Sequence, residues 1–450
     1  MGGRKFTTAL DAYAKLTKFT FTGSNSTALF STRFVHSDSY TRSVAANDIV
    51  PYMMLGSTDP PFNPFQIIQS MLNGADNMNV NVFNYGDGNG GDGYVLTNDF
   101  WNIYHIDAKS LDTIGPVKPN VPGAPKYDQQ IVIGCAHSLP ENGTDNHITF
   151  VSLASAIPGL KSMYFLYRAT DVHTREQIAE ITVDSISYMH SFGLTQNHVI
   201  LIAHPFFIDP TKIFRTFKAA DGFVWNPNKS TKFYITDLKT GFVKTVATEN
   251  FFFLHQINSF EDELGNIVVD ICTYKNGDAM NIMDMKTLRN ATGRAMFRKP
   301  TIKRYTIDPV HENVDVTTFQ DSVKYASNLD FPTINENYRY RKYCYVYGVV
   351  YTYNTTDFLD MALVKKDLCT GKRDAVWYKP GSYFNEAWFE ARPGATEEDD
   401  GVLLVDVIDS LTGASQMVVF DAGTLTIATA ANLPTNNPFG THGRFFKGVY

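Results

Sequence analysis

The chain has 450 residues, of which 44% are hydrophobic and 14% aromatic, and its formal net charge is −7. The negative charge and the lack of a long basic run argue against nucleic acid as a partner. The many Phe and Tyr residues favour β-strands, because aromatic side chains have high strand propensity. No apolar run in the sequence is long enough to span a bilayer as a helix.

The N-terminal residues and the cysteines indicate a cytoplasmic location. No apolar stretch follows the first five residues, so we expect no secretory signal. The four cysteines, Cys135, Cys272, Cys344 and Cys369, are widely spaced and form no CxxC pair. We therefore expect neither a disulfide framework nor a cysteine zinc site, and we place the protein in a reducing compartment.

Tight turns of one kind recur along the chain. Each follows a short apolar run, begins with Asp and ends in Gly or Leu. They lie at residues 107–111, 237–241, 284–288, 367–371 and 409–413. Asp at the start of a turn accepts hydrogen bonds from nearby backbone amides, and Gly tolerates a positive φ, so these turns predict hairpins. Recurring hairpins with few helical stretches favour a large antiparallel β-propeller, with a set of β-sandwiches as the alternative.

Two segments depart from this hairpin pattern. Residues 59–72 end in a short helical pattern with an apolar face, and residues 206–218 mix aromatic side chains with Lys212, Arg215 and Lys218. Both fit interfacial membrane patches, and both fit ordinary loops on a propeller face. We predict that they lie on one face, around a tunnel mouth, with the basic residues toward an anionic membrane.

Four of the eleven histidines stand in marked strand or turn contexts. They are His137, His190, His255 and His442. A single histidine beside apolar residues is more often a hydrogen-bonded core residue than a metal ligand. A propeller, however, brings residues from several blades to a common axis, and an all-imidazole site there suits Fe, Zn or Cu. No short-range ligand motif such as HExxH occurs, so spacing alone leaves the metal open.

Longer motifs around these histidines make the chain resemble the carotenoid cleavage oxygenase family. The likeness is strongest to its animal branch, the beta-carotene oxygenases and the retinal pigment epithelium isomerase. The matching segments are residues 33–38, 76–82, 136–137, 190–195, 255–262, 330–335, 382–386, 397–402 and 442–443. They run along nearly all of the chain in the family's order.

The resemblance implies a fold and a set of site residues. The fold would be all-β, a seven-bladed β-propeller forming one domain over residues 1–450, with loops and short helices capping one face. A non-haem Fe(II) would lie on its axis, held by His137, His190, His255 and His442. Carboxylates behind the histidines bind the remaining imidazole N–H and set the tautomer. By motif these carboxylates are Asp99, Asp330 and Glu386.

The chain departs from the family pattern in several places. Asp99 and Asp330 stand where relatives have Glu, which removes on the order of 1.3 Å of reach. We expect the backbone to move inward at Asp330 and a water to bridge Asp99 to its imidazole. The family's Asp-Pro-Cys-Lys segment lacks its cysteine and lysine at residues 59–62, which puts a lipid anchor there in doubt. The segment that normally precedes residues 10–19 is missing, which leaves closure of the first blade open.

The resemblance implies an oxidoreductase in which iron activates O2 and a double bond of a carotenoid or apocarotenoid is split into two carbonyls. An apolar tunnel would select the bond, with Val80 as a candidate wall residue or, equally, a core residue. Two alternatives stay open, a retinoid isomerase on the same iron scaffold and a non-catalytic carotenoid- or retinoid-binding propeller. The expected partners are the polyene, O2 and a membrane surface to which the protein binds peripherally.

Overall fold

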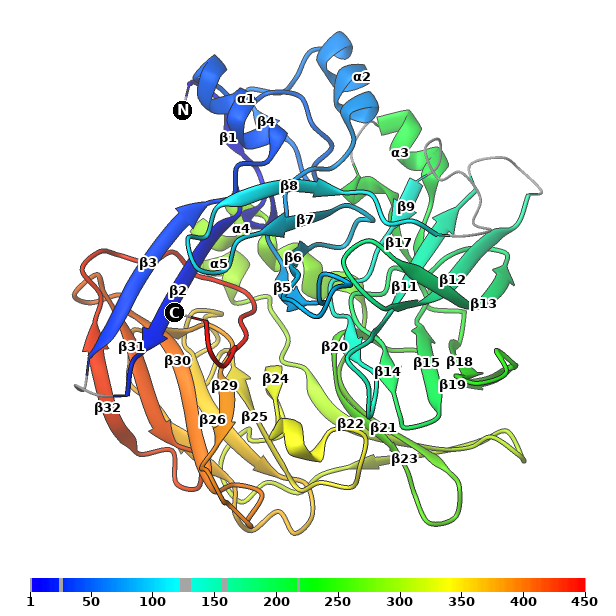
Figure 1. Cartoon of the computed structure of the whole chain (residues 1–450), viewed down its shortest axis with the longest axis vertical. Helices are drawn as coiled ribbons and strands as arrows, with labels where there is room; N and C mark the ends of the chain where they lie inside the picture. The colour runs from blue at the N-terminus through cyan, green and yellow to red at the C-terminus, as the bar shows by residue number, and fades with distance from the viewer. Residues whose placement is uncertain (1, 24–26, 122–130, 156–159, 217–218, 450) are drawn as a thin grey trace.

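Antiparallel sheets arranged around a central axis dominate the computed structural model (Figure 1). The structure describes residues 2–23, 27–121, 131–155, 160–216 and 219–449. Most blades are formed by strands that follow one another in the chain, and the first strand of each blade lies toward the axis. The all-β propeller predicted from the recurring hairpins is therefore confirmed.

The first three blades are formed by residues 81–248. Blade one contains β5 (Asn81–Asn84), β6 (Tyr94–Thr97), β7 (Ile103–Ile106) and β8 (Thr113–Val117). Blade two contains β9 (Ile131–Ile133), β10 (Leu139–Pro140), β11 (His147–Ala154), β12 (Ser162–Ala169) and β13 (Arg175–Val183). Blade three contains β14 (Gly193–Leu194), β15 (His198–Ala203), β18 (Thr231–Asp237) and β19 (Val243–Thr248).

The other three blades follow in residues 252–432. Blade four contains β20 (Phe252–Glu261), β21 (Ile267–Tyr274), β22 (Thr301–Asp308) and β23 (Asn313–Thr318). Blade five contains β24 (Asp330–Thr333), β25 (Tyr345–Val350), β26 (Ala362–Asp367) and β27 (Ala375–Trp377). Blade six contains β28 (Ser382–Phe384), β29 (Trp388–Ala391), β30 (Gly401–Asp409), β31 (Ala414–Asp421) and β32 (Ile427–Asn432).

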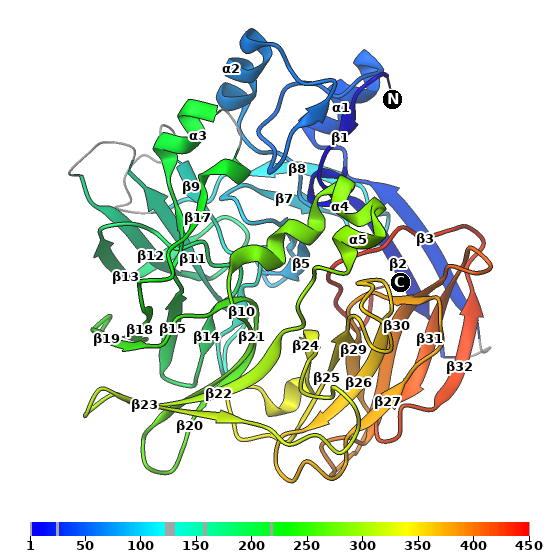
Figure 2. The ribbon, with the colours of Figure 1, turned by 180° about the vertical axis from the view of Figure 1, so that it is seen from behind.

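The helices are short and gather on one face and at the upper rim of the propeller (Figure 2). They are α1 (Asp38–Ala46), α2 (Pro64–Asn73), α3 (Pro210–Thr216), α4 (Met285–Arg289) and α5 (Ala291–Arg294), with the 3-10 turns η1 (Ala9–Asp11), η3 (Ala220–Gly222), η4 (Gly277–Met283) and η5 (Glu336–Tyr338). Two small sheets join this region, β1 (Lys5–Phe6) with β4 (Thr58–Asp59) and β16 (Phe206–Ile208) with β17 (Phe223–Trp225). None of the helices in the described ranges is long and apolar enough to cross a membrane.

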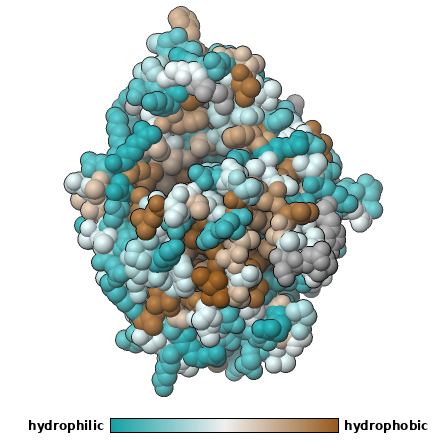
Figure 3. Space-filling view, turned by 90° about the vertical axis from the view of Figure 1, so that its left-hand side faces the viewer, coloured by the Kyte–Doolittle hydropathy of each residue, from teal (hydrophilic) through white to brown (hydrophobic). Residues whose placement is uncertain are grey.

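The expected number of seven blades is wrong, because the described residues form six. Between blade six and blade one, the described strands form only a two-stranded hairpin, β2 (Lys15–Phe21) with β3 (Ala28–Phe34). Its strands pair with each other alone among the described strands and are half-buried or exposed along their length. Figure 3 faces this side and shows hydrophobic residues among hydrophilic ones. On the hairpin, the side chains of Phe21, Leu29 and Phe34 are exposed.

Central strands are buried on both faces, which explains their continuous apolar runs. In β15, Val199 and Leu201 pack into one core cluster, whereas Ile200 and Ile202 pack into another on the opposite face. All four side chains are fully buried. The core therefore lies between the blades, whereas outer strands such as β23 and β32 are largely exposed.

Four of the five Asp turns close hairpins as predicted. Residues 107–111, 237–241, 367–371 and 409–413 join consecutive strands of one blade, and their Asp side chains accept backbone N–H groups. At Gly241, φ is 71° and a Cβ would lie 2.5 Å from the Ile178 oxygen, so only Gly fits. The prediction for residues 284–288 is wrong, because Asp284 caps the N-terminus of α4 instead. The same side-chain-to-backbone bonds serve both structures.

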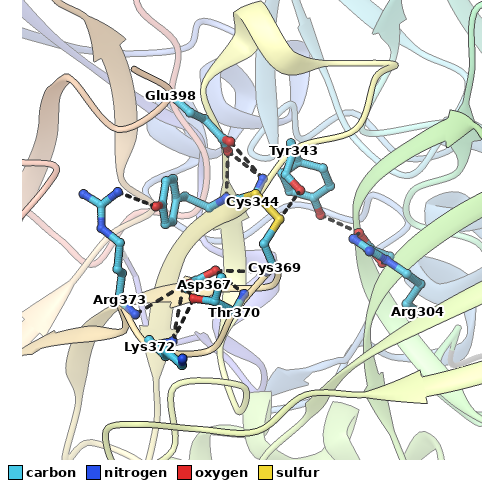
Figure 4. The surroundings of a disulfide bond; sticks show 11 residues. Arg304, Tyr343, Cys344, Asp367, Cys369, Thr370, Lys372, Arg373 and Glu398 are labelled. Atoms are coloured by element: carbon cyan, nitrogen blue, oxygen red, sulfur yellow. Dashed lines mark hydrogen bonds and ion pairs between the residues drawn. A yellow bond between two sulfur atoms is a disulfide. The ribbon is translucent and has the colours of Figure 1, made fainter. Parts of the chain in front are cut away.

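The expectation that no disulfide forms is also wrong, because Cys344 and Cys369 are bonded (Figure 4). They are 25 residues apart, but the pairing of Tyr345 with Asp367 in β25 and β26 brings them together. Backbone amides around the bond are held by the carboxylates of Glu398 and Asp367. Cys135 and Cys272 are buried free thiols. The disulfide removes the cysteine argument for a reducing compartment.

Removing this disulfide should lower the free energy of unfolding by about 3 kcal/mol, because the bond closes a loop that the unfolded chain would otherwise leave open. Denaturant unfolding of the Cys344→Ala/Cys369→Ala variant measures the loss. Dithiothreitol should destabilise the unmodified protein by a similar amount and leave the variant unchanged. Equal sensitivity of both proteins to the reductant would contradict the pairing.

Candidate metal centre

Four histidines from separate parts of the chain meet near the propeller axis. His137 precedes β10, His190 precedes β14, His255 lies in β20, and His442 follows the last strand. Their ligand nitrogens all lie within 4.8 Å of one another. The structure therefore brings together all four histidines that the motifs singled out.

The Nε2 atoms face one another. The distance between the Nε2 atoms of His137 and His190 is 3.0 Å, and that between His255 and His442 is 3.3 Å. Burial and the neighbouring imidazoles lower the pKa of His137 and of His442 well below the ordinary value, so both rings are neutral. Four convergent imidazole nitrogens form a donor set that suits a borderline divalent cation.

Carboxylates bind the far side of two rings directly. Asp99 Oδ1 lies 2.7 Å from His190 Nδ1, and Asp330 Oδ1 lies 2.6 Å from His255 Nδ1. Each carboxylate accepts the Nδ1 proton, which leaves the Nε2 lone pair directed at the centre. The water bridge that we expect at Asp99 is therefore wrong, because the contact is direct.

The local backbone explains how the short Asp side chains reach the rings. At Asp330 the pairing of β24 with β25 shifts register before Thr333, and Phe331 has a φ of 51°. Such an irregularity re-aims a side chain. Asp99 is anchored through a hydrogen bond from the Gly134 amide to its backbone oxygen. Gly134 allows this close approach, since a Cβ there would lie 2.3 Å from the Phe100 oxygen.

The other two rings have weaker partners. Glu386 Oε1 lies 3.1 Å from His442 Nδ1, but the geometry is not that of a hydrogen bond, and this Nδ1 has no hydrogen-bond partner in the described residues. Burial raises the pKa of Glu386 to about 7, against attraction to His255 and Arg444. Asn81 Nδ2 lies 3.5 Å from His137 Nδ1. Of the three predicted carboxylates, two therefore contact imidazoles closely and Glu386 less so.

Two tyrosines that the sequence analysis did not identify complete the carboxylate contacts. Tyr188 donates its hydroxyl to Asp99 Oδ2 at 2.9 Å, and Tyr274 donates to Asp330 Oδ2. Burial first, and then the adjacent carboxylate, raises the pKa of both phenols well above the ordinary value, so they remain donors. Tyr188 lies two residues before His190 and could have been noticed there. Tyr274 ends β21 and carries no comparable signal.

A cavity beside the centre is bounded by His137 and His255. Its wall also includes Leu139, Phe192, Ile257, Ile334, Trp388, Glu336, Arg339, Glu386 and Arg444. Val80, the candidate wall residue, is not among the described residues that line it. Its backbone oxygen instead accepts a hydrogen bond from Thr441, next to His442.

Comparisons with known proteins cover almost the whole chain. The sequence model of one family, described as retinal pigment epithelial membrane protein, matches residues 1–447. A human protein named mitochondrial carotenoid-cleaving dioxygenase is 26% identical, over 99% of this chain and 83% of its own. A protein of Gallus gallus named beta,beta-carotene 15,15'-dioxygenase is 24% identical, over 99% of this chain and 90% of its own.

Solved structures share the fold. The cobalt-substituted apocarotenoid oxygenase of Synechocystis superposes with a TM-score of 0.79 at 19% identity. The superposition covers 97% of this chain and 88% of that protein. At this identity the likeness supports the fold alone.

Loss of a carboxylate should weaken metal binding. We expect Asp330→Ala and Asp99→Ala each to reduce the affinity for Fe(II) or Co(II) by roughly ten- to a hundredfold, because the imidazole loses its acceptor and its fixed tautomer. Tyr274→Phe keeps the ring and removes only the donor to Asp330, so its effect should be smaller. Titration followed by calorimetry or by Co(II) absorption gives the affinities. Unchanged affinity in both Asp variants would contradict the role.

Proposed function

We propose that this chain, which belongs to the retinal pigment epithelial membrane protein family, is a non-haem iron dioxygenase that cleaves a double bond of a carotenoid or apocarotenoid. Family membership confirms the resemblance seen in the sequence. The observation that carries the proposal is the convergence of four imidazoles backed by Asp99 and Asp330. Relatives named as carotenoid-cleaving dioxygenases support the substrate class.

The metal in this proposal is Fe(II), held by His137, His190, His255 and His442. Four neutral ligands leave the ion its full positive charge and open coordination positions, and the bound iron would supply O2 activation. Asp99 and Asp330 orient two of the rings, and Tyr188 and Tyr274 hold those carboxylates in place. The apolar wall formed by Leu139, Phe192, Ile257 and Ile334 would exclude water from a bound polyene.

The direct carboxylate contacts also bear on the two alternatives. A non-catalytic binding propeller was suggested by the shorter Asp side chains. Distances of 2.7 Å and 2.6 Å to the imidazoles remove this ground for the non-catalytic alternative. A retinoid isomerase would use the same scaffold, so only the products separate it from an oxygenase.

Product analysis tests the function. After anaerobic purification and reconstitution with Fe(II), we expect about one iron per chain and aldehyde products from β-carotene or from an apocarotenal, with oxygen derived from O2. His255→Ala should lose iron and activity together, since it removes a ligand. A cis-retinol formed from a retinyl ester would instead identify an isomerase. Polyene binding with neither iron nor product would favour the non-catalytic alternative.

We further propose that α2 and α3 form the surface that meets a membrane. The predicted patches at residues 59–72 and 206–218 lie next to each other, and one cavity is lined by Phe62, Ile67 and Met71 on one side and Ile213 on the other. Phe65, Ile68 and Leu72 project from one face of α2 and are 84%, 51% and 81% exposed. Lys212 and Arg215 of α3 are exposed nearby, whereas Lys218 lies outside the described residues. An apolar helix face beside basic residues suits an anionic interface.

Vesicle binding tests this surface. The Phe65→Ser/Ile68→Ser/Leu72→Ser variant should bind anionic liposomes at least tenfold more weakly than the unmodified protein, because its apolar face is removed. Leu264→Ser is the matched control, since Leu264 is 86% exposed in the β20–β21 turn. Equal flotation of the triple variant and the control would contradict the proposal.

A further inference from the structure

The cavity beside the histidines contains two N–H donors that have no acceptor in the described part of the chain. Arg444 Nε and Trp388 Nε1 are buried atoms without a hydrogen-bond partner among the described residues. Both side chains line the cavity, together with His137 and His255. Arginine and tryptophan side chains donate hydrogen bonds and cannot accept them. A ligand that satisfied both would have to be an acceptor.

Aromatic rings hold the guanidinium of Arg444 without using its donors. Its Cζ lies 4.3 Å from the centre of the Phe83 ring and 5.9 Å from that of Trp388. A ring face stabilises positive charge, but the five N–H groups lie in the guanidinium plane and bind in-plane acceptors. The rings therefore position Arg444, and its Nε donor has no acceptor among the described residues.

The two carboxylates of the cavity are engaged elsewhere. Both oxygens of Glu336 accept hydrogen bonds from Arg339. Glu386 faces His442, with 3.1 Å between its Oε1 and the imidazole Nδ1. Both attract Arg444 through space, but neither forms an ion pair with it in the described part of the chain. A partly buried guanidinium without a hydrogen-bonded anion is a site for one.

We propose that Arg444 and Trp388 bind the carboxylate of an acidic polyene, so that a carboxylate-ended apocarotenoid is the preferred ligand class of this cavity. This inference rests on the proposed function, because it assumes that the polyene lies against the histidines. Leu139, Phe192, Ile257 and Ile334 provide the apolar wall for the chain of such a ligand. Arg444 provides a charged end point, and Trp388 a second donor. By binding the carboxylate, these two side chains would determine which double bond of the polyene lies beside the histidines.

Binding to chelator-treated, metal-free protein tests the inference without turnover, and it also prevents a carboxylate from binding a metal ion. All-trans-retinoic acid and its methyl ester share the polyene and differ in the charge. We expect the unmodified protein to bind the acid about ten- to a hundredfold more tightly than the ester, as charge-assisted hydrogen bonds imply. Ultrafiltration with absorbance of the free ligand measures both constants. Equal binding of acid and ester to the unmodified protein would overturn the proposal.

Two variants test whether Arg444 and Trp388 cause the preference for the acid over the ester. Arg444→Met should bring the acid-to-ester ratio to about one, and Trp388→Phe should lower it three- to tenfold, with the ester constant little changed in either. Arg33→Met is the matched control, because Arg33 lies on β3, is paired with Asp112 and has a side chain that is 44% exposed. A ratio that survives Arg444→Met in folded protein would overturn the assignment.

A free small carboxylate could occupy the same donors. Repeating the ester titration in acetate distinguishes a carboxylate on the polyene from a free carboxylate ion. If acetate strengthens ester binding to the level of the acid, the cavity takes a free anion, and the polyene need not be acidic, which would overturn the ligand class. No effect of acetate on the ester, together with competition against the acid, is the expected result. These binding constants do not depend on iron or on cleavage. The carboxylate preference can therefore be contradicted while the proposed dioxygenase function stands, and the reverse.

Discussion

The centre depends on how the last segment of the chain is clamped between blade six and blade one. The Gly440 amide donates to Asn385 in blade six, and the Thr441 hydroxyl donates to the Val80 oxygen just before blade one. Further along, Phe446 packs edge-on against Tyr94. His442 lies between these contacts. The contacts that close the propeller thus also place the imidazole of His442 beside the other three.

Among the described strands, this closure uses no seventh blade. The β2–β3 hairpin occupies the gap at the outside, and the C-terminal segment fills it near the axis. The family resemblance could not indicate this, because blade number is decided by which distant strands pair and not by any local motif. A short strand pair with half-buried faces contributes less core than a four-stranded blade. His442 is therefore held in place mainly by side-chain hydrogen bonds such as those of Asn385.

Local chemistry was predictable where a residue acts through its neighbours in the sequence. Asp turns and the helix at residues 64–73 follow from capping and turn preferences, and the family motifs marked the four histidines. Features made by distant pairing were not predictable. The Cys344–Cys369 bond depends on the register of β25 and β26, and Tyr274 of blade four donates to Asp330 of the neighbouring blade five. Asp284 shows the remaining ambiguity, since one Asp-x-x-Thr pattern serves a turn or a helix cap.

Hydrogen-bond acceptors and donors lie on opposite sides of the four imidazoles. Behind the rings lie acceptors, the buried carboxylate of Asp330 and that of Asp99, each held by a tyrosine donor. Two carboxylates are costly in a buried site, and a divalent cation at the Nε2 atoms offsets that cost. In the cavity in front of His137 and His255 lie the donors Arg444 Nε and Trp388 Nε1, which have no acceptor among the described residues. A cation is therefore favoured at the histidines, and a hydrogen-bond acceptor is favoured next to Arg444 and Trp388. An acidic polyene fits this arrangement, because its apolar chain can pass the metal while its carboxylate lies away from the metal.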